Sequence, residues 1–170
     1  MPRTLKRDIP GADWRISEED VRAKGWPALF GEDVDPRQPL AVEIGFGRGE
    51  FLMDLALAAP ATPYVGVEYS AKRVLKMARR LARAQIRNVR LLDATGEGVV
   101  RDLLAPSSVK AFWINFPDPW PKKRHHRRRL LQPALVHGLA LRLVQGGMLH
   151  VATDHEGYAE SIDAALAGEP

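Results

Sequence analysis

Short apolar runs alternate with amphipathic stretches from about residue 40 to the end of the chain. Five runs have the length and composition of buried strands, namely Leu40–Ile44, Tyr64–Val67, Val89–Leu92, Val109–Phe116 and Met148–Ala152. Apolar residues at helical spacing predict helices over Glu50–Ala58, Ala71–Gln85, Val99–Leu104, Pro133–Gln145 and Glu156–Ala167. Because strands alternating with helices build parallel sheets with right-handed crossovers, the pattern predicts an α/β fold with a doubly wound, Rossmann-like sheet.

Residues 1–39 are polar and rich in proline and glycine, and they start with MPRTLKRDIP. One short helix is expected there, around Ser17–Lys24, because Ser17 and Asp20 are spaced like a capping box. We therefore expect an irregular basic N-terminal arm over residues 1–39 and one domain over residues 40–170. Within that domain, Val109–Phe116 is almost wholly apolar and is expected to be buried on both faces of the sheet.

The arrangement of charge says more than the net charge of +4. From Ala71 to Leu92 there are eight Lys or Arg and no acid, and the stretch from Pro119 to Thr153 is also free of acids. Two such stretches favour a polyanionic partner, although solvated helix faces are the alternative.

The chain contains no cysteine, which excludes disulfides, thiolate metal ligands and cysteine nucleophiles and fits a cytoplasmic protein. No apolar run approaches the roughly 18 residues of a membrane span. The basic start has no apolar region after it, so we expect neither membrane insertion nor secretion.

The first strand leads into the glycine-rich turn VEIGFGRGEF, in which Gly45, Gly47 and Gly49 let the backbone approach a ligand. Glu68 follows at the end of the second strand, where dinucleotide-binding folds place the acid that binds ribose hydroxyls. NAD is therefore the first candidate ligand. However, the third glycine of that fingerprint would fall on Glu50, and a carboxylate at a helix N-terminus repels a pyrophosphate.

A cofactor with positive groups and no phosphate fits this turn better. S-adenosyl-L-methionine carries a sulfonium, an ammonium, a ribose and an adenine. Glu43 is expected to face its methionine end, Glu68 to bind the ribose hydroxyls, and Asp93, at the end of the third strand, to contact the adenine amino group. The alternative is a tight turn with surface acids and no ligand.

The fourth strand ends in the tip PDPWP, where Asp118 lies between two prolines that restrict the backbone. Trp120 is placed to stack on a base. A ring nitrogen such as guanine N7 has a free lone pair, so its methylation requires no prior removal of a proton. Asp118 would then stabilise the cationic ring through its charge rather than act as a base. Alternatively, Asp118 caps a turn and Trp120 belongs to the core.

After the tip comes KKRHHRRR, a run without acids. Lys122 is expected to hold a phosphate or a base edge, and the arginines to follow an RNA backbone, namely Arg124, Arg127, Arg128 and Arg129. The run by itself is also typical of a localisation signal or a nonspecific nucleic-acid patch. No metal is expected, because adjacent histidines in a cationic run are poor ligands and no acid nearby completes a set.

Together, VEIGFGRGEFL, GVEYS, NVRLLDATGEG, INFPDPWPKKRHHRRRL and ATDHEGYAE resemble the bacterial tRNA (guanine-N7-)-methyltransferase family over about residues 40–160. The tip with its Lys-Lys-Arg-His-His continuation is the specific part of this resemblance. The family implies a class I methyltransferase that uses S-adenosyl-L-methionine to form 7-methylguanosine at position 46, in the variable loop of tRNA.

The resemblance also implies roles for individual residues. Asp118 would be the catalytic acid and also a cofactor contact, and Lys122 and Asp154 would contact the substrate. The remaining implied cofactor contacts agree with the acids at the strand ends, namely Glu43, Glu68 and Asp93.

Members of the family continue past the last helix into two further strands, with a Thr-Arg-x-Glu type substrate motif between them. We therefore expect the sheet of this chain to lack the last two strands. Met148–Ala152 would then be an exposed sheet edge.

Two other functions stay open. The chain is alternatively a methyltransferase with another nucleic-acid acceptor, such as an exocyclic amine of a base, or a noncatalytic RNA-binding protein with a degenerate methyltransferase fold. The presence of Glu43, Glu68 and Asp93 argues against decay of the cofactor site. The sequence leaves the oligomeric state and the tRNA selectivity open.

Overall fold

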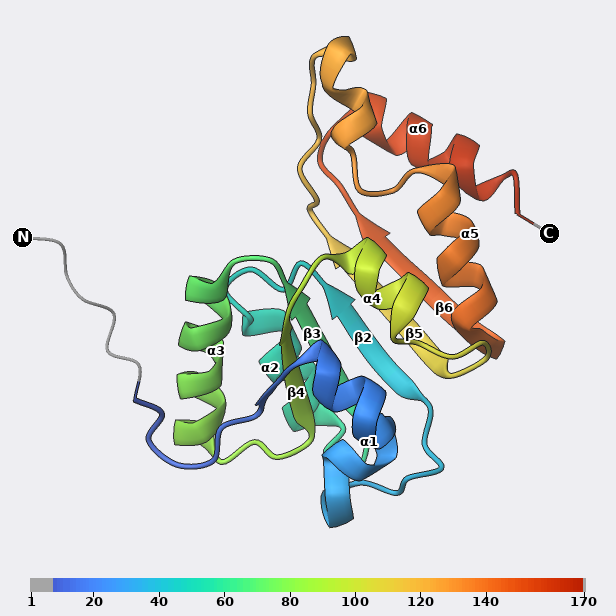
Figure 1. Cartoon of the computed structure of the whole chain (residues 1–170). Helices are drawn as coiled ribbons and strands as arrows, with labels where there is room; N and C mark the ends of the chain where they lie inside the picture. Colours follow the sequence, from blue (N-terminus) through green and yellow to red (C-terminus); the bar gives the residue numbers. More distant parts are fainter. Residues whose placement is uncertain (1–7, 170) are drawn as a thin grey trace, which may run out of the picture.

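A computed structural model describes residues 8–169 and contains one six-stranded sheet with helices on both faces (Figure 1). Its strands are β1 (Arg15–Ile16), β2 (Leu40–Ile44), β3 (Tyr64–Glu68), β4 (Val89–Asp93), β5 (Val109–Asn115) and β6 (Leu143–Ala152). The spatial order is β1-β4-β3-β2-β5-β6, and all neighbouring strands are parallel. The expected doubly wound parallel sheet is confirmed, and the strand order reverses between β2 and β5.

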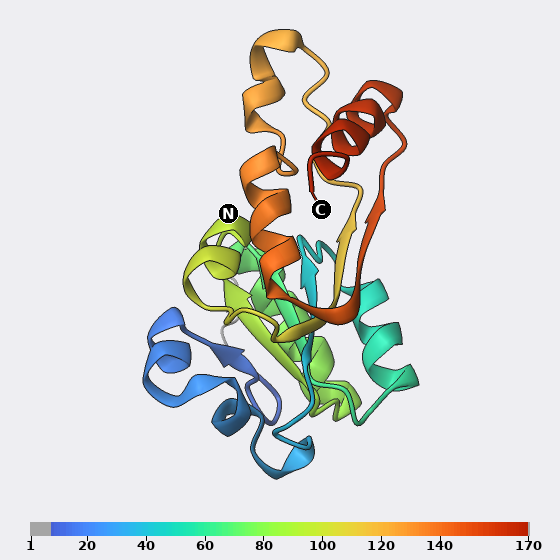
Figure 2. The ribbon, with the colours of Figure 1, turned by 90° about the vertical axis from the view of Figure 1, so that its right-hand side faces the viewer.

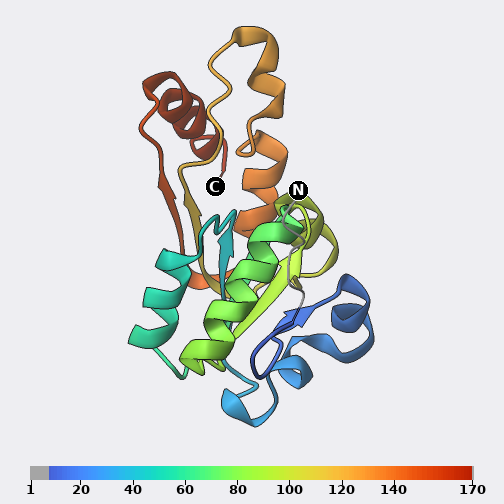
Figure 3. The same cartoon turned by 90° about the vertical axis from the view of Figure 1, so that its left-hand side faces the viewer.

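The helices form two layers. They are α1 (Glu18–Phe30), α2 (Glu50–Ala58), α3 (Ala71–Ala84), α4 (Gly96–Asp102), α5 (Pro133–Arg142) and α6 (Glu156–Leu166), with short 3-10 helices η1 (Gly31–Asp33) and η2 (Lys123–Arg128). Helices α2 and α3 lie on one face of the sheet (Figure 3). They bury Leu52, Val74 and Leu81 against it. The other four helices pack on the opposite face, where Leu139 and Tyr158 are fully buried. Burying an apolar side chain of this size stabilises the fold by about 1.5–3 kcal/mol.

The β5–β6 end of the sheet differs from the expectation of full burial. Trp113 of β5 is only half-buried; it stacks on His150 of β6 at 5.1 Å and 9° and meets the exposed Phe51 edge-on. Strand β6 starts earlier than expected, at Leu143, and α5 ends at Arg142. Within residues 8–169, β6 pairs only with β5, so Met148–Ala152 lies at the sheet edge as expected.

The segment before β2 is more regular than the irregular basic arm that the composition suggested, and over residues 8–39 acids outnumber basic side chains. Strand β1 pairs with β4. Because β1 depends on this partner from a distant part of the chain, the local sequence pattern does not predict it. Ser17 and Asp20 form both bonds of the capping box, at 3.0 and 3.1 Å, and α1 bends at Gly25. Residues 1–7 lie outside the described part of the chain, so their expected character stays a prediction.

Candidate active site

The glycine-rich turn joins β2 to α2 at the carboxyl end of the sheet. Gly45 and Gly49 have φ of 76° and 77°, a region that costs an ordinary residue about 1–2 kcal/mol. A Cβ on Gly49 would overlap the sulfur of Met77, whereas a Cβ on Gly45 would meet nothing within 4 Å. Glycine at position 49 thus avoids an overlap with Met77, and Gly45 leaves open space above the turn for a ligand.

Glu68 ends β3 and fastens this turn. Its carboxylate, 1% exposed, accepts hydrogen bonds from the backbone N–H of Gly47 at 3.0 Å and of Ser70 at 3.1 Å. The Arg73 guanidinium lies 3.5 Å from Glu68 Oε2. Glu68, which was expected to bind ribose hydroxyls, therefore also stabilises the conformation of the glycine-rich turn. It also lines the cavity described below.

Glu43 lies in the middle of the sheet and is 3% exposed. Asn115 Nδ2 donates to its Oε1 at 3.4 Å, while Oε2 has no hydrogen-bond partner among residues 8–169. Burial raises the pKa of Glu43 to about 7, and the Asn115 hydrogen bond only partly opposes this. A buried carboxylate oxygen without a partner is costly, so it favours a cationic or N–H-bearing ligand group.

A cavity of about 500 Å³ lies over the carboxyl ends of β2 to β5. Gly45 and Glu68 line it on one side, and Asp118, Trp120 and Arg128 line it on the other. The structure thus brings the glycine turn and the proline-rich tip, which are about 70 residues apart in the sequence, to one space. This is the position at which open α/β sheets bind ligands.

Asp118 is exposed at the tip and has a strained residue on each side of it. Phe116 and Trp120 have φ of 50° and 44°, a left-handed conformation that is rare for side chains of this size. The tip continues from β5, and Phe116 N–H still donates to Ala152 O of β6 at 2.8 Å. Strain of this kind persists only where the surrounding contacts impose it.

The basic run after the tip forms η2, which extends beyond the carboxyl ends of β5 and β6 next to α6 (Figure 2). Lys122, Arg124 and Arg127 are exposed and lie outside the cavity lining. Arg128 reaches the cavity, with its guanidinium 5.0 Å from the centre of the Trp120 ring. Arg129 differs from the expectation, because it is 5% exposed and cannot follow an RNA backbone.

Three of the expected acids do not line the cavity. Glu43 is buried, and it is its hydrogen-bond partner Asn115 that lines the cavity. Asp93 is exposed at the end of β4, and it is the following residues, Ala94 to Glu97, that contribute to the lining. Asp154 is exposed between β6 and His155, the N-cap of α6. Gly47 and Gly49 shape the turn without lining the cavity. These five residues keep their proposed roles only as predictions.

Several lining residues were missed from the sequence. Asn115 and Tyr69 follow the pattern of a polar or aromatic residue at a strand end, which could have indicated them. Thr95 is the N-cap of α4, and its Oγ1 accepts from Gly98 N–H at 3.2 Å. Arg73 was assigned to a basic surface, yet it lines the cavity next to Glu68.

The other basic stretch is largely engaged within the chain. Five of its eight cations have internal partners, namely Arg73 with Glu68, Arg79 with Asp8 O, Arg80 with Arg48 O, Arg87 with Asp33, and Arg90 with Leu29 O. For residues 71–92 the alternative interpretation, a solvated helix face, is therefore favoured over a surface for a polyanion. Segment η2 is the stronger candidate for a polyanion surface.

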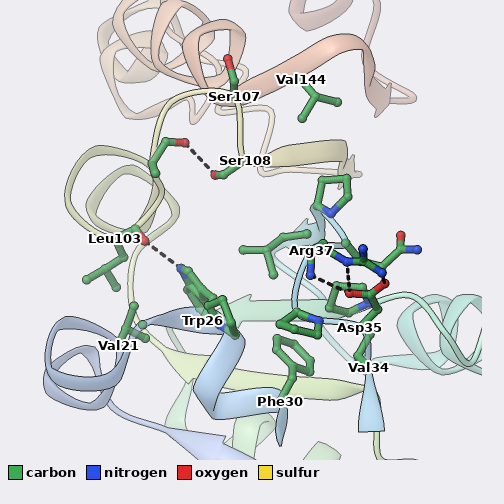
Figure 4. A pocket seen from close by; sticks show the side chains of 18 residues that line it. Val21, Trp26, Phe30, Val34, Asp35, Arg37, Leu103, Ser107, Ser108 and Val144 are labelled. Carbon is green, nitrogen blue, oxygen red and sulfur yellow. Dashed lines mark hydrogen bonds and ion pairs between the residues drawn. The ribbon is translucent and has the colours of Figure 1, made fainter. Parts of the chain in front are cut away.

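A second cavity of about 530 Å³ lies at the opposite end of the strands (Figure 4). Its walls are mostly apolar and include Val21, Phe30 and Leu103, and Trp26 is fixed by a 2.8 Å hydrogen bond from Nε1 to Leu103 O. The Asp35–Arg37 pair lies at its edge. None of the residues predicted to bind cofactor or substrate lines it.

In the described part of the chain, no three His, Asp or Glu side chains are grouped closely enough to hold a metal ion. None of the helices over residues 8–169 has the length and apolar character needed to cross a membrane.

Comparison with known proteins connects this geometry to sequence relatives. The model of a family described as "Putative methyltransferase" matches residues 37–170. The tRNA (guanine-N(7)-)-methyltransferase of Bordetella pertussis is 48% identical over 84% of this chain and 55% of its own length. The enzymes of the same name from Nocardia farcinica and Thermus thermophilus are 43% and 45% identical over 91% and 81% of this chain. The chain spans about half the length of these curated relatives.

Solved structures agree at the level of the fold. An antibiotic-related methyltransferase has a TM-score of 0.59 at 16% identity, covering 82% of this chain and 70% of that chain. The 16S rRNA methyltransferase KamB has a TM-score of 0.58 at 18% identity, covering 98% of this chain and 71% of that chain. These similarities confirm the class I methyltransferase fold. With the family model matching the whole region from before β2 to the last residue, the chain belongs to the family described as "Putative methyltransferase".

Proposed function

We propose that this protein transfers a methyl group from S-adenosyl-L-methionine to N7 of a guanine in the variable loop of tRNA. The observation that supports this most is that the glycine turn and the acidic, aromatic tip line one cavity of about 500 Å³. Relatives that carry the name tRNA (guanine-N(7)-)-methyltransferase add support. The proposed compartment is the cytoplasm, where tRNA is found.

The residues around the turn fit this cofactor. The Glu43 oxygen without a partner suits an ammonium group, and the open space at Gly45 admits a ligand without displacing any side chain. Glu68 lines the cavity beside it and offers acceptors for hydroxyl groups. When bound, S-adenosyl-L-methionine supplies an electrophilic methyl group on its sulfonium.

The tip residues fit a ring nitrogen as the acceptor. Guanine N7 attacks with a lone pair and needs no base, so the chain has to orient the ring and stabilise the positive charge that develops on it. Trp120, already in contact with Arg128 and His125, offers an aromatic face on the cavity side. The exposed carboxylate of Asp118 supplies a negative charge at the same wall.

The surface next to the tip fits an RNA backbone. Lys122, Arg124 and Arg127 are exposed, and no acid occurs between Pro119 and Thr153 to compete for them. Phosphate contacts of this kind supply affinity and register, whereas the tip selects the base. In this proposal Asp93 contacts the adenine of the cofactor, and Asp154 contacts the substrate.

The decisive experiment incubates the chain with a tRNA transcript and methyl-labelled cofactor, followed by nuclease digestion and identification of the labelled nucleoside. We expect 7-methylguanosine. A matched transcript with 7-deazaguanosine, which lacks the acceptor nitrogen, should take up no label.

Other results would favour the alternatives. Label on an exocyclic amine would support a methyltransferase with a different acceptor. RNA binding without transfer, together with no calorimetric heat from S-adenosylhomocysteine, would support a noncatalytic RNA-binding protein.

A further inference from the structure

Arg129 is a buried cation next to the tip, and its contacts are all with neutral groups. Its Nε donates to Pro119 O at 2.8 Å, and its Nη1 donates to Gly157 O at 3.1 Å and to Ser161 Oγ at 3.0 Å. Its guanidinium also lies 4.8 Å from the centre of the Tyr158 ring. No ion pair joins it to a carboxylate of residues 8–169, so its desolvation is offset by these four contacts alone.

The partners of Arg129 belong to two separate segments. Pro119 is part of the tip, directly between Asp118 and Trp120, whereas Gly157, Tyr158 and Ser161 belong to α6. Helix α6 is itself fixed to the chain beyond η2, because the fully buried Tyr158 hydroxyl accepts from Leu131 N–H at 3.0 Å. One side chain thus joins the backbone of the tip to a packed helix.

The other contacts of the tip are weaker, namely the 3.4 Å contact of His126 Nε2 with Pro121 O and the packing of His125 and Arg128 on Trp120. The prolines of the tip cannot donate backbone hydrogen bonds, and Trp120 has a strained φ of 44°. An arginine fork is suited to such a connection, because its planar donors fix several acceptors relative to one another.

We propose that Arg129 is a positioning residue that holds the Asp118–Trp120 tip against α6 at the wall of the candidate active site. The importance of this for methyl transfer rests on the proposed function, whereas the structural connection does not. A misplacement of about 1 Å at a reacting centre costs on the order of a hundredfold in rate.

The variant that tests this is Arg129→Lys, which keeps the charge but loses the fork. Arg90→Lys is a matched control, because Arg90 is also buried, at 3% exposure, and donates to Leu29 O, Arg87 O and Val89 O. It stacks on Trp14 and Phe30, far from the tip. Both substitutions remove the same kind of contacts, so they separate local positioning from general stability.

The first readout is amide hydrogen exchange by NMR at three hydrogen-bonded amides around the tip, those of Phe116, His125 and Leu131. Arg129→Lys should speed exchange there by at least about tenfold, as expected for the loss of one charge-assisted hydrogen bond. Arg90→Lys should leave these amides within about twofold of the unmodified chain. Unchanged exchange in Arg129→Lys, or equal acceleration in both variants, would overturn the proposal.

If Arg129→Lys does not fold, Ser161→Ala is used in its place. This substitution removes one hydrogen-bond acceptor of Arg129. It also introduces alanine, a good helix former, into α6. It should speed exchange at the same three amides by about threefold, as expected for one weakened hydrogen bond. No change there would also overturn the proposal.

The second readout is kinetic. Arg129→Lys should lower kcat for tRNA by about tenfold and leave KM within about twofold, because the exposed arginines that contact RNA are untouched. Arg90→Lys should leave both constants within about twofold. A rise in KM with unchanged kcat would contradict the positioning role. If the unmodified chain transfers no methyl group, the proposed function fails, while the exchange experiment still decides the role of Arg129.

Discussion

The side-chain amide of Asn115 donates to Glu43 Oε1 at 3.4 Å in the middle of the sheet, and the other oxygen of Glu43 has no partner among residues 8–169. The two residues end or nearly end the neighbouring strands β5 and β2, at the point where the strand order reverses. This relationship leaves a buried carboxylate whose pKa is raised to about 7 by desolvation. We therefore predict that both cofactor affinity and stability depend on pH through Glu43.

Cofactor affinity should rise with pH through the neutral range. An ammonium group pairs with ionised Glu43 and not with the protonated form, so S-adenosylhomocysteine should bind about tenfold more tightly at pH 8 than at pH 6. Calorimetry at the two pH values measures this difference. Glu43→Gln should bind weakly at both, with a ratio near one; a tenfold ratio retained in the variant would assign the pH dependence to another group.

The free energy of unfolding should show the opposite trend for the same group. The pKa of the Glu43 carboxyl is about 7 in the fold and 4.5 in the unfolded reference state. As pH rises, the unfolded chain therefore loses this proton at a lower pH than the folded chain does. The contribution of Glu43 to stability is therefore full below pH 4.5 and is lost as pH rises through 7, by at most about 3 kcal/mol. Urea unfolding of the chain and of Glu43→Gln, compared between pH 5 and pH 8, should show a smaller loss in the variant. Parallel curves would refute the assignment.

Asp118→Asn should lower methyl-transfer kcat by about a hundredfold, because a preorganised charge near a developing cation is lost. Cofactor affinity should fall by much less if the role is mainly charge stabilisation. Asp102→Asn, at an exposed Asp that pairs with Arg101, is the control for a lost surface acid. Equal losses in kcat and in cofactor affinity would contradict the division of roles.

Replacement of Arg124 and Arg127 by alanine should weaken RNA binding regardless of sequence. Each lost phosphate contact should reduce the slope of log affinity against log salt by about one. The control replaces Arg37 and Arg101, which are exposed arginines paired with Asp35 and Asp102 outside η2. A salt slope that stays the same after the Arg124 and Arg127 changes would mean that η2 does not touch phosphate.

Gly49→Ala should cost more stability than Gly45→Ala. The two glycines have nearly equal positive φ, 77° and 76°, which costs alanine about 1–2 kcal/mol. Only at Gly49 would the new methyl group also overlap Met77, adding about 1–3 kcal/mol of overpacking, whereas a Cβ at Gly45 meets nothing within 4 Å. Thermal unfolding of the two variants measures the difference, and equal shifts would mean that Met77 moves aside freely.

The pattern of the sequence determined most of the framework. Five strands and the helices between them were predicted within a few residues, apart from the start of β6, because the period of apolar positions depends on the local geometry of each segment. The convergence of Gly45, Glu68 and Asp118 on one cavity also followed from sequence, since the carboxyl ends of parallel strands share an edge. The tip and the basic run could be singled out as candidate functional segments from the sequence, because their composition is unusual over a short stretch.

Tertiary structure alone decided how these segments use one another. In the sequence, Arg129 is one more cation in a basic run and is expected to be exposed. In the structure it is buried by its contacts with Pro119 and with α6. Strand β1 exists only because β4 offers an edge, and the Glu43–Asn115 contact exists only because β2 and β5 are neighbours. Each of these contacts joins residues that are far apart in the chain. The period of apolar positions describes the surroundings of one segment only. It carries no information about which distant segment that segment will contact.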